Sequence, residues 1–165
     1  MGNNTTPIAP QGNGTIATWS YSGGAAPHEC VNAPMACYGD TKYIHTSTRD
    51  GVHLFTTPPS GYPDTEIARV ELFSRCKDEA FSDQGIQLGF LIGGTQYWSG
   101  NLMVTSASVY VELRNSWATN PNTSLPWTWN DIQNLQFGIK AVRMTGGWDG
   151  HPRCSQLQLI VWCNE

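Results

Sequence analysis

The sequence predicts an all-β protein built as a sandwich of short antiparallel strands. Its 17 Gly and 10 Pro residues favour turns over long helices. Short runs in which apolar and polar residues alternate recur along the chain, with turn residues between them. A length of 165 residues suits one ordinary domain. The nine Lys and Arg residues are scattered and the formal net charge is −4, so nucleic acid is not an expected partner.

The first 14 residues are polar and lack both the charged and the apolar region of a secretion signal. No run in the chain approaches the roughly 18–20 apolar residues that span a bilayer, so no membrane association is expected. We therefore expect a flexible N-terminal arm over residues 1–14 and a single sandwich domain over 15–165. Asn3, Asn4 and Ile8 are the candidate residues through which this arm would contact a partner.

Nine segments with alternating character are predicted as strands: 16–19, 43–45, 52–55, 68–76, 86–92, 96–98, 109–113, 135–141 and 157–163. Within 68–76, Val70, Leu72 and Cys76 share one face while charged residues occupy the other, which is typical of a strand with one wet face. Gly93 and Gly94 separate two runs and predict a tight hairpin. The last strand is expected to pair with its predecessor, 135–141. His45 and His53 are expected to face each other across a hairpin.

The stretch 125–144 changes its pattern in the middle. Thr128 and Asp131 have the spacing of a helix N-cap and predict a short helical turn over 129–134. From Leu135 the pattern has a period of two. One predicted face holds Leu135, Phe137, Ile139 and Ala141, and the other holds Gln136, Gly138, Lys140 and Val142. A helical turn that leads directly into a half-buried strand is suited to closing one end of a sandwich.

The five cysteines contain no CxxC pair, so neither a zinc site nor another metal is expected. If the strands 68–76 and 154–163 are antiparallel, with Val70 near Ile160, then Cys76 lies near Cys154 at one end of the sheet. A disulfide there requires Cα atoms within about 7 Å. Five reduced thiols are the alternative.

Residues that carry out catalysis are not grouped in any recognisable motif. The chain has no Gly-rich phosphate loop, no GxSxG and no HExxH, so we expect neither an enzyme nor a cofactor. Aromatic residues are the remaining candidates for a binding site, and the chain contains seven Trp. Trp148 in the Gly-rich loop TGGWDG is the one expected to be exposed. With Asp149 and His151 it is a candidate platform for a sugar ring or a protein partner.

The order of motifs resembles a known family. TKYIHTSTRDGVHLFTT, IARVELFSR, GTQYWSG, SVYVELRNSWATNPNTSLPWTWNDIQNLQFGIKA and CSQLQLIVW, over about residues 15–163, are similar to jelly-roll or concanavalin-like β-sandwich structural proteins of tailed bacteriophages. The resemblance implies a jelly-roll sandwich in which 117–121 and 127–138 have an architectural role and no catalytic one.

That resemblance also implies a function. The expected protein is a non-enzymatic virion component, a capsid decoration (cement) protein on the outer surface of the capsid, with a tail component as the second choice. Its expected partners are the major capsid protein or other virion subunits, and its expected state is a homotrimer. The alternative, from a different class, is a carbohydrate-binding or adhesive module whose loop aromatics hold a glycan.

Overall fold

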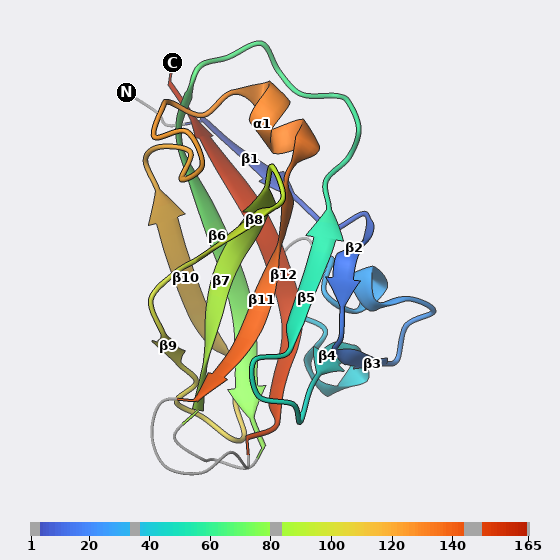
Figure 1. Cartoon of the computed structure of the whole chain (residues 1–165). Helices are drawn as coiled ribbons and strands as arrows, with labels where there is room; N and C mark the ends of the chain where they lie inside the picture. Colours follow the sequence, from blue (N-terminus) through green and yellow to red (C-terminus); the bar gives the residue numbers. More distant parts are fainter. Residues whose placement is uncertain (1–3, 34–36, 80–83, 144–149, 165) are drawn as a thin grey trace.

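A computed structural model describes residues 4–33, 37–79, 84–143 and 150–164, which form two antiparallel sheets (Figure 1). Sheet A has the order β10 (Val111–Trp117), β6 (Ile67–Asp78), β12 (Pro152–Cys163), β4 (Tyr43–His45) and β3 (Ser20–Ser22), with β1 (Asn4–Ile8) also paired with β12. Sheet B has the order β2 (Gly12–Ala17), β5 (Val52–Thr56), β11 (Gln136–Arg143), β7 (Gln84–Ile92) and β8 (Thr95–Trp98), with β9 (Leu102–Met103) also paired with β7. The prediction of an all-β antiparallel sandwich is confirmed.

Among the residues that the structure describes, helical structure is confined to three short segments, η1 (Pro27–Cys30), η2 (Gly39–Thr41) and α1 (Trp129–Asn134). The predicted helical turn is confirmed with its cap, because Thr128 Oγ1 accepts from the backbone N–H of Asp131 at 3.1 Å and Asp131 Oδ2 accepts from that of Thr128 at 2.8 Å. Figure 1 shows α1 at the end of the sandwich where β11 begins. Within the described residues, no helix has the length and apolar character needed to cross a membrane.

The inner faces of the two sheets form one core. Phe55, Phe90 and Phe137 are fully buried in it. The ring of Phe90 lies edge-on to Trp117 and Trp127, with centroids 4.6 and 5.5 Å apart. The predicted alternation is confirmed in three strands, whose buried apolar residues belong to this core: Val70, Leu72, Cys76, Phe137, Ile139, Ala141, Leu157, Leu159, Val161 and Cys163.

The predicted Gly93–Gly94 hairpin is also confirmed. Ile92 pairs with Thr95, and both glycines have positive φ, 58° and 83°, which matches the twist of a two-residue hairpin. Two expected pairings are wrong. The strands β11 and β12 lie in different sheets, because the chain crosses from sheet B to sheet A between them. His45 and His53 are separated in the same way, in β4 of sheet A and β5 of sheet B.

The N-terminal segment differs from the flexible arm expected over residues 1–14. Residues 4–8 form β1, which runs antiparallel to β12 from Asn4 opposite Cys163 to Ile8 opposite Leu159. The side chain of Ile8 is buried in the core, at 4% exposure. Residues 12–14 belong to β2. The physical reason is that an edge strand leaves unpaired backbone groups, and this polar segment supplies the missing partners.

Candidate functional site

Sheet A turns a face of paired charges to the outside of the sandwich. Arg75 Nη2 lies 2.7 Å from Glu112 Oε1, and Arg114 Nη1 lies 2.7 Å from Glu71 Oε1. Both ion pairs join the neighbouring strands β6 and β10. Because each guanidinium group already has a carboxylate partner, this part of the face has little charge left for a ligand.

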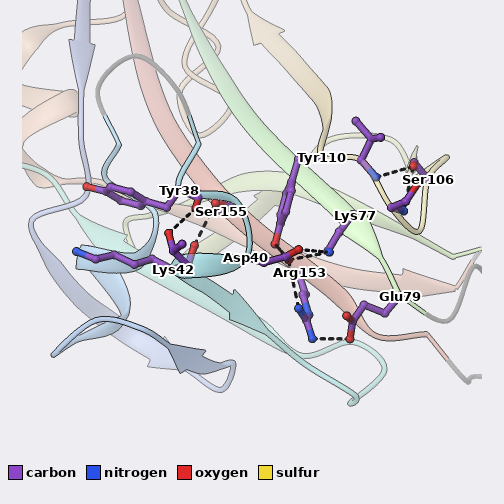
Figure 2. A network of polar contacts seen from close by, with 12 residues as sticks. Tyr38, Asp40, Lys42, Lys77, Glu79, Ser106, Tyr110, Arg153 and Ser155 are labelled. Atoms are coloured by element: carbon purple, nitrogen blue, oxygen red, sulfur yellow. Dashed lines mark hydrogen bonds and ion pairs between the residues drawn. The ribbon is translucent and has the colours of Figure 1, made fainter.

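Asp40 in η2 is the centre of a further polar network on the outside of sheet A (Figure 2). Its carboxylate lies 2.7 Å from Lys77 Nζ and 3.3 Å from Arg153 Nη1, and it accepts from the Tyr110 hydroxyl at 3.1 Å. The hydrogen bond from Lys77 is the largest cause that lowers the pKa of Asp40. Arg153 also contacts Glu79. The charges compensate one another and tie η2 to β6 and β12, so the network has a structural role.

The aromatic rings on the outside of sheet A are covered by cations. Arg69 Cζ lies 4.0 Å from the centroid of Trp162, and Arg114 Cζ lies 4.4 Å from that of Phe73. Two side-chain amides on this face donate to the same acceptor, the carbonyl oxygen of Ala33. The donor of Gln156 lies 2.8 Å from it and the donor of Gln158 lies 2.9 Å from it. The outer face of sheet A is therefore largely occupied by its own side chains and by the segment that contains Ala33.

Sheet B has a different outer face, which we call the Trp98 face. It consists of residues of β11, β7 and β8 and one residue after β8: Gln136, Gly138, Lys140, Gln87, Gly89, Leu91, Gln96, Trp98 and Asn101. In its central row, Gly138 is paired with Gly89, and Gly89 with Trp98. The chain neighbours of Gly89 are buried core residues, so Gly89 faces outward. Figure 1 shows α1 at one end of this sheet and not over its middle.

The indole ring of Trp98 lies against the backbone of Gly89. A Cβ atom built at Gly89 would stand 2.5 Å from Cε3 and 3.0 Å from Cδ2 of Trp98, so only glycine leaves room for the ring there. The Trp98 side chain is partly exposed. The ring is thus held from below by the sheet while part of its surface remains in contact with solvent.

Neutral amides lie on the same face as this ring. Gln96 Oε1 accepts from Trp98 Nε1 at 3.1 Å, and Asn101 Oδ1 accepts from Gln87 Nε2 at 2.9 Å. Gln136 Oε1 accepts from the backbone N–H of Thr15 at 2.7 Å. Each bond uses one end of an amide. The opposite end of each amide has no hydrogen-bond partner among the described residues. These ends are the amino groups of Gln96, Asn101 and Gln136 and the carbonyl oxygen of Gln87, so the face offers both donors and an acceptor.

A hollow of about 600 Å³ opens at the sandwich edge where β2 and β3 meet η1, and its lining includes Asn13, Trp19, Tyr21 and His53. His53 Nε2 lies 3.1 Å from Asn13 Oδ1. Burial lowers the pKa of His53 to about 4, so its imidazole is neutral near pH 7. Trp19 is 3% exposed and donates from Nε1 to the carbonyl oxygen of Gly51. The hollow therefore offers one partly exposed ring, that of Tyr21, and no cation.

Three of the residues predicted as a site from the sequence have no described position. Trp148, Asp149 and Asn3 lie outside the described residues. His151 is exposed, and its backbone N–H donates to Asp78 Oδ1 at 2.9 Å. Asn4 begins β1, and Ile8 is buried in the core.

Cys76 and Cys154 do lie side by side. They are paired residues of β6 and β12, and both have free thiols in the structure. In the part of the chain that the structure covers, no group of three or more His, Cys, Asp and Glu side chains is placed to hold a metal ion.

The fold has known counterparts among solved structures. A structure described as the xylan-binding module CBM15 matches with a TM-score of 0.56 and 14% identity, over 99% of each chain. The CBM22-1–GH10 modules of Clostridium thermocellum xylanase 10B, complexed with xylohexaose, match with a TM-score of 0.52 and 6% identity, over 96% of this chain and 28% of that one.

A third structure, the tandem CBM22-1–CBM22-2 domain of Paenibacillus barcinonensis Xyn10C, matches with a TM-score of 0.51 and 12% identity, over 99% of this chain and 47% of that one. At such identities the likeness shows the fold, a jelly-roll-like β-sandwich, as predicted. No protein-family model and no curated protein sequence matches this chain.

These comparisons overturn the expected function. The prediction of a phage capsid decoration protein is wrong, since the structures that share this fold are carbohydrate-binding modules and nothing among them points to a phage protein. Nothing among these structures supports a major capsid protein as partner or a homotrimer. The structure with the highest TM-score of the three is described as a binding module.

The sequence did contain a signal for the Trp98 face. The alternation in 135–142 already placed Gln136, Gly138 and Lys140 on one side of a strand, and 96–98 was a predicted strand. The sequence pattern did not show which of these strands pair with one another. Two glycines and a tryptophan form one row only when β8, β7 and β11 are adjacent and in register.

Proposed function

We propose that this chain is a carbohydrate-binding module that holds a glycan across the Trp98 face, with a sugar ring stacked on Trp98. The observation that carries the proposal is the indole ring supported by the bare backbone of Gly89. A pyranose ring has an apolar side of C–H groups and a rim of hydroxyls. The indole ring suits the first, and donors and acceptors from neighbouring amides suit the second.

The contrast between the two sheets supports this choice of face. On sheet A, carboxylates and guanidinium groups neutralise one another and the rings are covered. On the Trp98 face, the cation nearest the ring, Lys140, stands 5.9 Å from its centroid, and the hydrogen bonds that the amides make engage only one end of each. The similar solved structures include a xylan-binding module and a complex with xylohexaose, so xylan and xylohexaose are the first ligands to try.

The test is isothermal titration with xylohexaose, together with a glycan array on the full chain. We expect saturable binding that Trp98→Ala weakens by at least about fivefold, because a stacked ring contributes on the order of 1–3 kcal/mol. Trp162→Ala is the matched control, since it removes the same ring from the outside of sheet A. A chain that binds no glycan would overturn the function. Glycan binding that Trp98→Ala leaves intact would overturn the choice of face.

A further inference from the structure

Lys140 is the one charged residue among the nine that define the Trp98 face. It lies on β11, between Val52 of β5 and Gln87 of β7 in the sheet register. Its side chain is partly buried, and Nζ stands 5.9 Å from the centroid of the Trp98 ring. The ammonium group is thus held beside the aromatic platform, at a separation comparable with the length of one sugar residue.

No carboxylate neutralises this cation. None of the nine residues that define the Trp98 face is Asp or Glu, although the whole chain carries a formal net charge of −4. No ion pair forms between Lys140 and any described residue, whereas Lys77, Arg75 and Arg114 on sheet A each have a carboxylate within 2.7 Å. An unneutralised ammonium group in a surface of neutral amides attracts an anion, and a hydrogen bond between the two is roughly twice as strong as a neutral one.

We propose that the Trp98 face selects glycans that carry a carboxylate, as hexuronic acid residues do. Lys140 Nζ donates a charge-assisted hydrogen bond to that carboxylate while the adjoining sugar ring stacks on Trp98. This inference rests on the proposed function, since it names the ligand class for the same face. It adds a charge requirement that a face made only of Trp98 and amides would not have.

The test compares each acidic polysaccharide with its own neutral form. Full-length protein is run in native affinity gels that contain glucuronoxylan, polygalacturonate, or either polymer after its carboxyl groups have been reduced to primary alcohols. We expect about tenfold tighter binding to at least one acidic polymer than to its reduced form, the ratio that one charge-assisted hydrogen bond provides. The ratio should fall as salt rises.

Three variants assign the effect to Lys140. Lys140→Gln should bind the acidic and the reduced polymer equally, while Lys140→Arg should keep the preference because the positive charge remains. Lys42→Gln is the matched control, because it removes one positive charge beside Tyr38 and away from sheet B, and it should behave as wild type.

The experiment distinguishes a failure of the charge preference from a failure of glycan binding itself. Equal binding to acidic and reduced polymers, or a preference that survives in Lys140→Gln, would overturn this inference and leave the glycan-binding function standing. Binding to none of these polymers, together with an empty glycan array, would overturn the proposed function and this inference with it.

Discussion

Cys154 lies directly opposite Cys76 in the antiparallel pairing of β6 and β12, and both side chains are buried in the core. The register predicted from the sequence was correct at this pair and shifted by one residue at Val70, which faces Val161 and not Ile160. The shift comes from a bulge between Cys154 and Gln156. The extra residue, Ser155, donates from its hydroxyl to the carbonyl oxygen of Lys42 at 3.1 Å, as Figure 2 shows.

The first prediction is that Cys76 and Cys154 form a disulfide when the chain refolds in oxidised glutathione. Residues directly opposite in an antiparallel pair have Cα atoms about 4.5–5.5 Å apart, which a disulfide can bridge. Oxidation should accompany folding, because burial raises the pKa of the Cys154 thiol in the native state and makes it unreactive there. The bond should stabilise the fold by about 4–5 kcal/mol on the chain-entropy model.

Non-reducing peptide mapping and urea denaturation check this prediction. The stabilisation should be absent in Cys76→Ser, which cannot form the bond. If both cysteines remain open to alkylation without reductant after oxidative refolding of the wild type, the pair does not form.

The second prediction concerns Gly89. Gly89→Ala should reduce glycan binding, because the added Cβ would stand 2.5 Å from Cε3 of Trp98 and displace the ring. The Tyr97 carbonyl oxygen also crowds that position, so the free energy of unfolding should fall by about 1–3 kcal/mol. Gly100→Ala is the control, since a Cβ there meets nothing within 4 Å. Urea denaturation measures the change in stability, and titration with the glycan measures the change in affinity. If Gly89→Ala were as stable as Gly100→Ala and bound the glycan equally well, the packing described would be contradicted.

The third prediction concerns the cap of α1. Thr128→Ala removes the oxygen that accepts from the Asp131 N–H, and we expect the free energy of unfolding to fall by about 1 kcal/mol. Thr105→Ala serves as the comparison, because Thr105 is exposed and makes no side-chain hydrogen bond to the described residues. Equal midpoints for the two variants in chemical denaturation would show that the cap does not stabilise the fold.

The fourth prediction is a loss of stability in mild acid that depends on His53. Burial lowers the pKa of His53 from 6.5 to about 4, so the unfolded chain binds a proton at a higher pH than the folded chain does. The contribution of neutral His53 to the free energy of unfolding is fully present above pH 6.5. It is lost as the pH falls from about 6.5 to 4, and the total loss is about 3 kcal/mol.

The measurement is the free energy of unfolding in urea at pH 7 and at pH 5. His53→Gln should show a smaller difference between the two pH values than wild type, whereas His151→Gln, which changes an exposed histidine, should not. The same pH dependence in wild type and His53→Gln would contradict the assignment.

Local features of this protein follow from the sequence alone. Side chains alternate in any strand, so the pattern in 135–142 was sufficient to place Gln136, Gly138 and Lys140 on one face. Backbone preferences act over a few residues, and for that reason the Gly93–Gly94 hairpin and the Thr128 cap could be predicted as well.

Only the tertiary structure decided which strands are neighbours. Sheet order depends on contacts between residues far apart in the chain, and the period-two pattern is the same for every possible partner strand. The pairing of β7 with both β8 and β11 brings Trp98, Gly89 and Lys140 onto one face, and the pairing of β1 with β12 orders residues that look like a free polar arm. The bulge at Ser155 likewise has no local signal. Without that extra residue, a strand that points Leu157 into the core would turn Cys154 outward, away from Cys76.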